Sequence, residues 1–175
     1  MAFQPQHPLQ QKGFTLVELM VVVVIIGIML TTVVFTLGDK RLEQLEDESR
    51  RVVALLGVAT EEAILQSQEL AFVVEDGEYR FLRLDKDNNK WLPLNDDSLL
   101  RARAVPSEMK VEVSVENMPP ALLDEEDSNP RVFILSSGEM TPFELDIRND
   151  HFDDKRYFRL SGNPLGEVSI EGPLE

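Results

Sequence analysis

The sequence contains no cysteine, and it has only two histidines, His7 and His151. The lack of cysteine excludes disulfides, thiolate metal sites and a cysteine nucleophile. With only two histidines, a histidine-based metal site or a Ser-His-Asp triad has almost no residues to draw on. No pair of acidic residues stands out as a general acid and base either. The chain is therefore not expected to be an enzyme, and no metal, cofactor or catalytic residue is predicted.

Positive charge is also scarce. The 17 Lys and Arg residues are outnumbered by 32 Asp and Glu residues, which gives a formal net charge of -15. A surface of this sign repels nucleic acid and anionic lipid headgroups. The tail from Ser161 to Glu175 contains no Lys or Arg at all. Nucleic acid is accordingly not an expected partner.

One histidine lies in an acidic segment. His151 has three aspartates close to it in the sequence, Asp150, Asp153 and Asp154. The segment lacks the glycine and the distal glutamate of a calcium-binding loop. A solvated turn is the preferred interpretation, and a metal site is the alternative.

Charge is absent from the run between Leu19 and Leu30, and the apolar stretch extends from Phe14 to Leu37 with Glu18 as its only ionisable side chain. These residues, about 24 in number, would span about 36 Å as a helix. The hydrocarbon core of a bilayer is about 30 Å thick. Residues 14–37 are therefore predicted to cross a membrane once.

Neither a secretory signal peptide nor an ordinary membrane anchor accounts for all features of this apolar run. A secretory signal peptide would have several basic residues in front of it and a small-x-small cleavage site behind it. Only Lys12 precedes the run, and no such site follows it. An ordinary anchor leaves Glu18 unexplained, because a carboxylate in an apolar helix is costly and by default indicates a functional role.

Residues Gly13 to Glu18, in the order Gly-Phe-Thr-Leu-Val-Glu and preceded by Lys12, resemble the processing site of type IV prepilins and type II secretion pseudopilins. The resemblance implies that residues 1–13 are a leader. A membrane aspartyl peptidase of that family would cut between Gly13 and Phe14 on the cytoplasmic face. The same prepilin peptidase would then methylate the new terminal amine of Phe14.

Glu18 gains a partner if this resemblance holds. The family implies that its carboxylate pairs with the methylated amine of a neighbouring subunit, or of its own chain, during filament assembly. An opposite charge lowers the free-energy cost of holding either ion in a medium of low dielectric constant. The alternative is that Glu18 lies at the level of the lipid headgroups and has no role in assembly.

The helix is predicted to continue from Phe14 to Gln68, with residues 38–68 forming an amphipathic half outside the membrane. The charged segment from Asp39 to Arg51 is interpreted as a solvated face with local ion pairs. A coiled-coil dimer is the alternative. Apolar residues recur at helical spacing and predict a buried stripe; they are Leu42, Leu45, Val52, Leu56, Ala59, Ala63 and Ile64.

Residues 69–175 change to a period of two, which predicts strands, and Asp76-Gly77 is a hairpin signal. The loop 116–130 is acidic and contains prolines; a solvated linker is preferred over a segment that faces a partner. Antiparallel sheets are expected, packed as a sandwich or against the helix. The predicted strands cover residues 70–74, 79–84, 109–116, 131–135, 143–148, 155–160 and 167–171.

Features spread over most of the chain are similar to the H-type minor pseudopilin of the type II secretion system, a group related to minor pilins of the FimT kind. Tyr79, Phe81 and Trp91, which belong to these features, are predicted to be core residues. The segments that carry the similarity are Glu61–Ser67, Tyr79–Phe81, Lys90–Leu94, Leu100–Arg103, Val105–Pro106, Ser136–Phe143 and Leu165–Val168.

This resemblance implies an α+β, type IV pilin-like fold and a structural role. The subunit would lie at or near the tip of the periplasmic pseudopilus that exports folded proteins across the outer membrane. Other minor pseudopilins, the major pseudopilin, the prepilin peptidase, the inner membrane and secreted substrates are the expected partners. The chain would sit in the inner membrane of a Gram-negative bacterium, with its N-terminus cytoplasmic before processing and residues 69–175 in the periplasm. The alternative is a minor type IV pilin of the FimT or FimU kind, in pilus assembly or DNA uptake.

Overall fold

The computed structural model describes residues 14–116, 129–150 and 155–175, except for the side chains of residues 30–39. Contacts divide the chain between Lys40 and Arg41 into two compact units, which are described separately. The predictions for the leader 1–13, for most of the loop 116–130 and for His151 lie outside the described residues.

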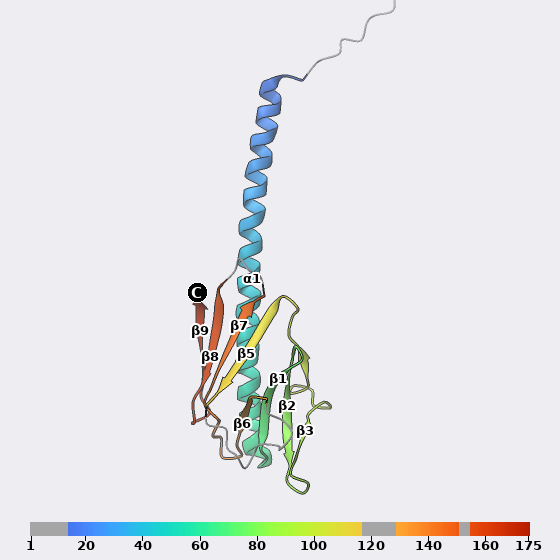
Figure 1. Cartoon of the computed structure of the whole chain (residues 1–175), viewed down its shortest axis with the longest axis vertical. Helices are drawn as coiled ribbons and strands as arrows, with labels where there is room; N and C mark the ends of the chain where they lie inside the picture. Colours follow the sequence, from blue (N-terminus) through green and yellow to red (C-terminus); the bar gives the residue numbers. More distant parts are fainter. Residues whose placement is uncertain (1–13, 117–128, 151–154) are drawn as a thin grey trace, which may run out of the picture. The chain divides into compact units, whose positions relative to one another are not determined.

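One helix, α1, extends over Leu16–Gln66 (Figure 1), close to the predicted range of 14–68. It begins after Thr15, whose side-chain oxygen accepts a hydrogen bond from the backbone N–H of Glu18. It ends where Ser67 adopts a left-handed φ of 52° and the N–H of Gln68 bonds to the carbonyl of Ala63 at 3.0 Å. This is the Schellman arrangement, in which the last free carbonyls of a helix find donors.

Within the described part of residues 41–175, the strands form a five-stranded and a four-stranded sheet, and every pairing is antiparallel (Figure 1). The first sheet consists of β1 (Leu70–Glu75), β2 (Glu78–Asp85), β3 (Lys90–Pro93), β4 (Arg103–Ala104) and β6 (Arg131–Ile134). Its strand order is β3-β2-β1-β6, with β4 also paired to β2. The second sheet consists of β5 (Met109–Val115), β7 (Phe143–Asn149), β8 (Tyr157–Gly162) and β9 (Val168–Leu174), and its strand order is β5-β7-β8-β9.

All seven predicted strands are present, and the hairpin at Asp76-Gly77 is confirmed by φ values of 52° and 74° in that turn. These values fit a type I′ turn, which needs positive φ at both central residues. Two strands, β3 and β4, were not predicted. β4 spans only two residues, and β3 contains Pro93, a residue that argues against a strand. β8 begins at Tyr157 rather than at Lys155.

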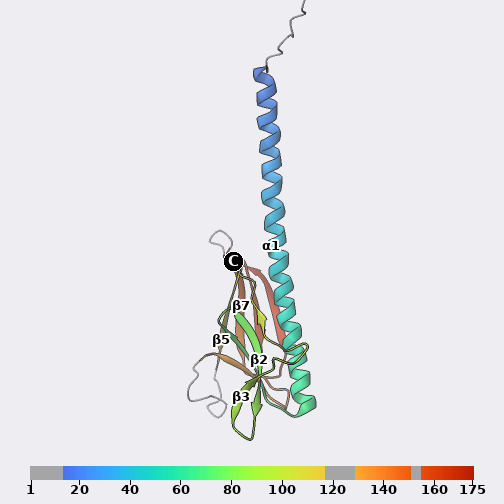
Figure 2. The same cartoon turned by 90° about the vertical axis from the view of Figure 1, so that its right-hand side faces the viewer.

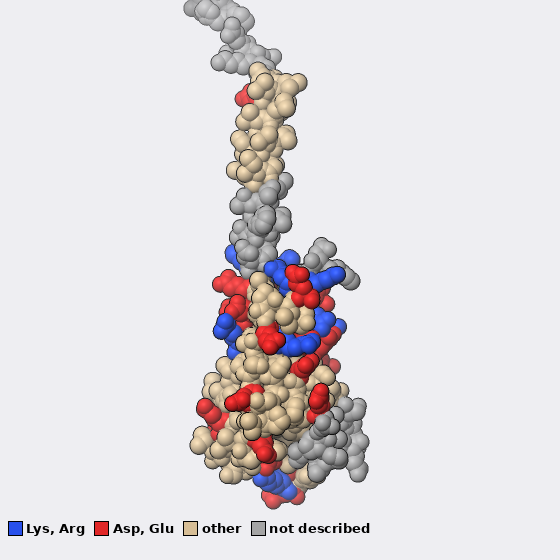
Figure 3. Space-filling view, turned by 90° about the vertical axis from the view of Figure 1, so that its left-hand side faces the viewer, with Lys and Arg blue, Asp and Glu red and all other residues tan. Residues whose placement is uncertain are grey.

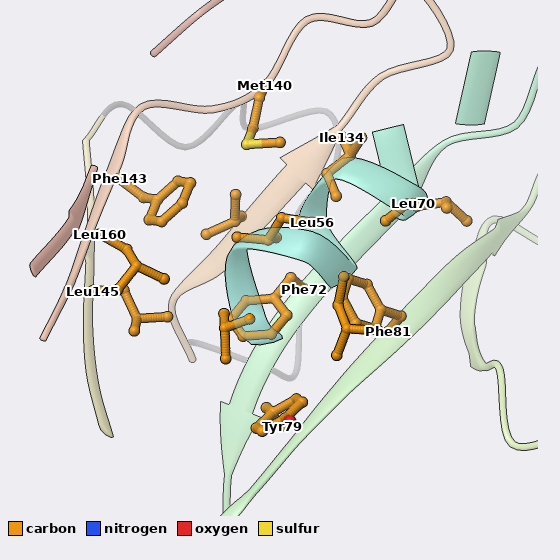
Figure 4. Close-up of a cluster of buried hydrophobic side chains, with 14 of the residues drawn as sticks. Leu56, Leu70, Phe72, Tyr79, Phe81, Ile134, Met140, Phe143, Leu145 and Leu160 are labelled. Carbon is orange, nitrogen blue, oxygen red and sulfur yellow. The ribbon is translucent and has the colours of Figure 1, made fainter. Parts of the chain in front are cut away.

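The second half of α1 and both sheets share one hydrophobic core (Figure 2). Figure 4 shows Leu56 of the helix at its centre, with Leu145 and Leu160 of the second sheet on one side and Phe81 of the first sheet on the other. The helix therefore closes one face of each sheet, and the α+β class is confirmed. The fully buried helix side chains include Leu45, Val52, Leu56, Ala59 and Ala63, all members of the predicted stripe.

The stripe ends earlier than predicted. The side chain of Ile64 is 48% exposed, whereas Leu55, which was not in the stripe, is buried. Successive helix positions are separated by about 100°, so Ile64 points well away from Ala63. It lies instead beside Gly138, where an added Cβ would be 3.1 Å from its Cδ1 atom.

The core prediction for the aromatic residues is confirmed for Tyr79 and Phe81, which are both 1% exposed. Trp91 is only partly buried and packs against a smaller cluster on the other face of the first sheet. Its ring centroid lies 5.4 Å from that of Phe133. Successive side chains of a strand point to opposite faces, which is why this sheet contributes to two clusters.

Candidate processing and assembly site

The beginning of α1 brings Phe14, Thr15 and Glu18 together at one helix end. Phe14 precedes the helix and is 73% exposed. The carbonyl and the hydroxyl of Thr15 accept hydrogen bonds from the N–H of Glu18 at 3.1 and 3.3 Å. This is one half of a capping box, whose signature is Thr-x-x-Glu. The capping role of Thr15 was missed from the sequence, although that spacing was there to indicate it.

Glu18 lies in the first turn of α1. The first turn of a helix carries a partial positive charge from its free N–H groups, and an acidic side chain there is stabilising. Glu18 is the acidic residue of that turn. An amine at Phe14 would lie four residues before Glu18 in the sequence. Gly13, the other predicted residue of the processing site, lies outside the described residues.

The helix segment that follows presents apolar side chains on all sides. A helix that is apolar all round needs lipid or other protein around it. The exposed large apolar residues between 16 and 29 are Leu16, Val17, Leu19, Met20, Val21, Val22, Val23, Val24, Ile25, Ile26, Ile28 and Met29.

Among the described residues, no helix is both long enough and apolar enough to cross a membrane.

The second half of α1 holds a buried carboxylate that the sequence did not reveal. Glu48 is 5% exposed, which corrects the prediction that the whole segment from Asp39 to Arg51 is a solvated face. Its Oε1 atom accepts a hydrogen bond of 2.9 Å from the hydroxyl of Tyr79, and its Oε2 atom lies 2.5 Å from Arg51. Burial, and then the hydrogen bond to Glu48, raise the pKa of Tyr79. An ion pair of the predicted exposed kind does occur between Arg50 and Glu46 at 2.7 Å.

The described residues contain no group of three or more His, Asp and Glu side chains that could hold a metal ion. A hollow of about 300 Å³ on the first sheet is lined by residues that include Trp91, Arg80 and Glu75. Glu75 lies 3.5 Å from Arg80 in an ion pair.

Comparison with known proteins gives two family matches along the chain. The prokaryotic N-terminal methylation motif matches residues 9–34, and the type II transport protein GspH matches residues 48–166. The type II secretion system protein H of Pseudomonas aeruginosa is 34% identical over 143 residues, which cover 77% of this chain and 81% of that protein. The protein of the same name from Escherichia coli K12 is 32% identical over 145 residues, covering 80% and 82%.

A solved structure shows the same fold. The minor pseudopilin EpsH of the type II secretion system of Vibrio cholerae superposes with a TM-score of 0.59 at 22% identity, covering 75% of this chain and 98% of that one. The GspH match extends over more than half of the chain and includes α1 from Glu48 onward, the first sheet, and all strands of the second sheet except β9. The chain therefore belongs to the type II transport protein GspH family.

Proposed function

We propose that this chain joins the periplasmic pseudopilus, at or near its tip, and supports the export of folded proteins across the outer membrane. The observation that supports the proposal is that two family matches occur on one chain. The N-terminal methylation motif covers the start of α1, and the GspH match covers the domain built on its second half. The described part of the domain is organised around one packed hydrophobic core, which fits a subunit that works by contact.

The proposed location is the inner membrane of a Gram-negative bacterium. Residues 14–37 would form a single anchor, with the N-terminus cytoplasmic before processing. Residues 38–68 and the β domain of residues 69–175 would lie in the periplasm. The apolar sequence of the anchor and the exposure of its side chains between 16 and 29 support this assignment.

Processing is proposed between Gly13 and Phe14, followed by methylation of the Phe14 amine. Because Thr15 caps the helix, Phe14 precedes it and is exposed. A peptidase reaches a bond more easily outside a helix than inside one. The new amine and the Glu18 carboxylate would then be a matched pair of charges for assembly, within one chain or between neighbours.

The proposed partners are the other minor pseudopilins, the major pseudopilin, the prepilin peptidase and the secreted proteins. The DNA-uptake alternative needs a basic surface that can follow a phosphate backbone. Here arginines are neutralised by acids: Arg148 lies 2.7 Å from Glu112, and Arg159 lies 2.7 Å from Asp146. Figure 3 shows blue and red atoms intermingled on the upper part of the domain. Uptake of DNA is therefore not favoured.

Deletion of the gene from its own bacterium tests this function. The extracellular amount of the proteins exported by type II secretion should fall about tenfold or more, and the same proteins should accumulate, folded, in the periplasm. The full-length chain supplied from a plasmid should restore export. Unchanged export in the deletion strain, combined with a loss of DNA uptake, would favour the pilus alternative instead.

A further inference from the structure

We propose that three exposed apolar side chains, Ile64, Leu65 and Leu165, form a docking patch for another pseudopilin whose contact surface has an apolar centre edged by lysine or arginine. The proposal rests on the function proposed above, because it takes the neighbour to be a subunit of the same filament. It adds the location of the contact and the chemistry of the partner.

The patch joins separate segments of the chain. Leu165 is 76% exposed, Leu65 is 79% exposed and Ile64 is 48% exposed. An added Cβ on Gly138 would touch Ile64, and one on Gly166 would lie 3.6 Å from Thr60 and collide with the carbonyl oxygen of Gly138. The end of α1, the turn before β7 and the turn between β8 and β9 therefore meet here. Single exposed leucines are ordinary, but apolar side chains from converging segments mark an interaction surface.

Leu165 is held rigidly for an exposed residue. The side-chain oxygen of Asn163 accepts hydrogen bonds from the N–H groups of Leu165 and Glu167, at 3.0 and 3.1 Å. The following residue, Gly166, has a φ of +80° and no room for a side chain. A residue whose backbone is already ordered loses less conformational freedom on binding, which suits an anchor residue at an interface.

The neighbouring turn is equally constrained. The carboxylate of Glu69 accepts hydrogen bonds from the N–H and the hydroxyl of Ser136, at 2.7 and 3.0 Å. The N–H of Gly138 bonds to the carbonyl of Leu135 at 2.9 Å. The surface around Leu165 is thus formed before any partner arrives.

The charge around the patch defines the partner. The segments 52–66, 134–147 and 160–175 contain acidic residues and no Lys or Arg. Lys86, beyond the end of the helix, faces Glu69 at 3.6 Å. In Figure 3 the lower part of the domain shows red atoms among tan ones, and blue atoms gather above it and at its lower end. The acids nearest in sequence to the three patch residues are Glu61, Glu62, Glu69 and Glu167. Glu139 follows Gly138, the residue that lies beside Ile64.

An acidic rim favours a partner with a basic edge, because complementary charge speeds association and suppresses wrong partners. A second copy of this chain would bring the same acidic residues into contact and would be repelled. Nucleic acid and anionic lipid are disfavoured for the same reason. A different pseudopilin with lysine or arginine around an apolar contact is the occupant that fits.

Co-purification tests the patch. The tagged full-length chain is produced with prepilin peptidase and each other pseudopilin of the same secretion system, and is purified in detergent. Leu165→Ser should lower the amount of the bound pseudopilin about tenfold or more, as expected for an interface anchor. The paired change Glu61→Lys with Glu62→Lys should also lower it. The matched control is Leu99→Ser, which changes another exposed leucine and should leave binding unchanged.

Each outcome has a defined meaning, once circular dichroism shows that the variants are folded. If the unmodified chain binds no pseudopilin, both the proposed function and the patch are contradicted. If it binds one, and Leu165→Ser binds equally well, the function stands and the patch is wrong. Equal losses in Leu165→Ser and Leu99→Ser, or stronger binding after the charge reversal, would also overturn the proposal.

Discussion

Glu18→Val is expected to leave the chain in the membrane fraction and cut at Phe14, while its incorporation into pseudopili falls about tenfold or more. Valine suits an apolar helix at least as well as glutamate does, so insertion should not suffer. The methylated amine of a neighbouring subunit, however, would lose its partner. An unpaired ion in a medium of low dielectric constant costs several kcal/mol, and about 1.4 kcal/mol already corresponds to a factor of ten.

The measurement is the amount of the chain that co-purifies with pseudopili sheared from cells that overproduce the filament. Glu43→Val is the matched control, because Glu43 is an exposed acid on the same helix, beyond the predicted membrane segment. It should be incorporated as well as the unmodified chain. Normal incorporation of Glu18→Val would show that this carboxylate has no role in assembly.

Tyr79→Phe is expected to lower the free energy of unfolding of the domain by about 1–3 kcal/mol. The change removes only a hydroxyl, but that hydroxyl donates to the buried carboxylate of Glu48 at 2.9 Å. A buried acceptor that loses its donor costs about this much. The fluorescence of Trp91, the single tryptophan, reports unfolding in denaturant of the full-length chain in detergent. Tyr157→Phe, at the only other tyrosine, is the matched control and should change the free energy by less than about 0.5 kcal/mol.

The same pair of variants tests a pH dependence. In the folded protein the pKa of Tyr79 lies above its ordinary value of 10.0, because burial and the Glu48 carboxylate disfavour the phenolate. The resulting stability is fully present below about pH 10 and is lost as the pH rises above that value. Between about pH 8 and 11 the unmodified chain and Tyr157→Phe should therefore lose more stability than Tyr79→Phe. An identical loss in all three would contradict the assigned role of the Glu48–Tyr79 hydrogen bond.

Local patterns were enough to predict most elements of the fold. Alternation along residues 109–116 predicted a strand with one covered face, and Val111 and Val113 do pack against the core. Such alternation follows directly from the two-residue period of a strand. The end of α1 was also close to its prediction, although the left-handed Ser67 that terminates the helix carries no strong sequence signal.

The features that were missed depend on residues far apart in the chain. Glu48 looked like one more charge on a solvated face, because its partner Tyr79 lies 31 residues further on. The exposure of Ile64 likewise depends on how the turn at Gly138 approaches the helix. The docking patch was not foreseen for the same reason. The segments that carry Leu165 and Ile64 are far apart in the sequence, and both approach the turn at Gly138.

The most direct test of the central claim is mass spectrometry of the amino terminus after co-expression of the full-length chain with a prepilin peptidase. The account predicts a mature protein that begins at Phe14, carries a methyl group on its terminal amine and remains in the membrane fraction. Gly13→Val in the same experiment should yield the uncut chain. A wild-type chain that stays uncut, or that begins at any residue other than methylated Phe14, would contradict the account.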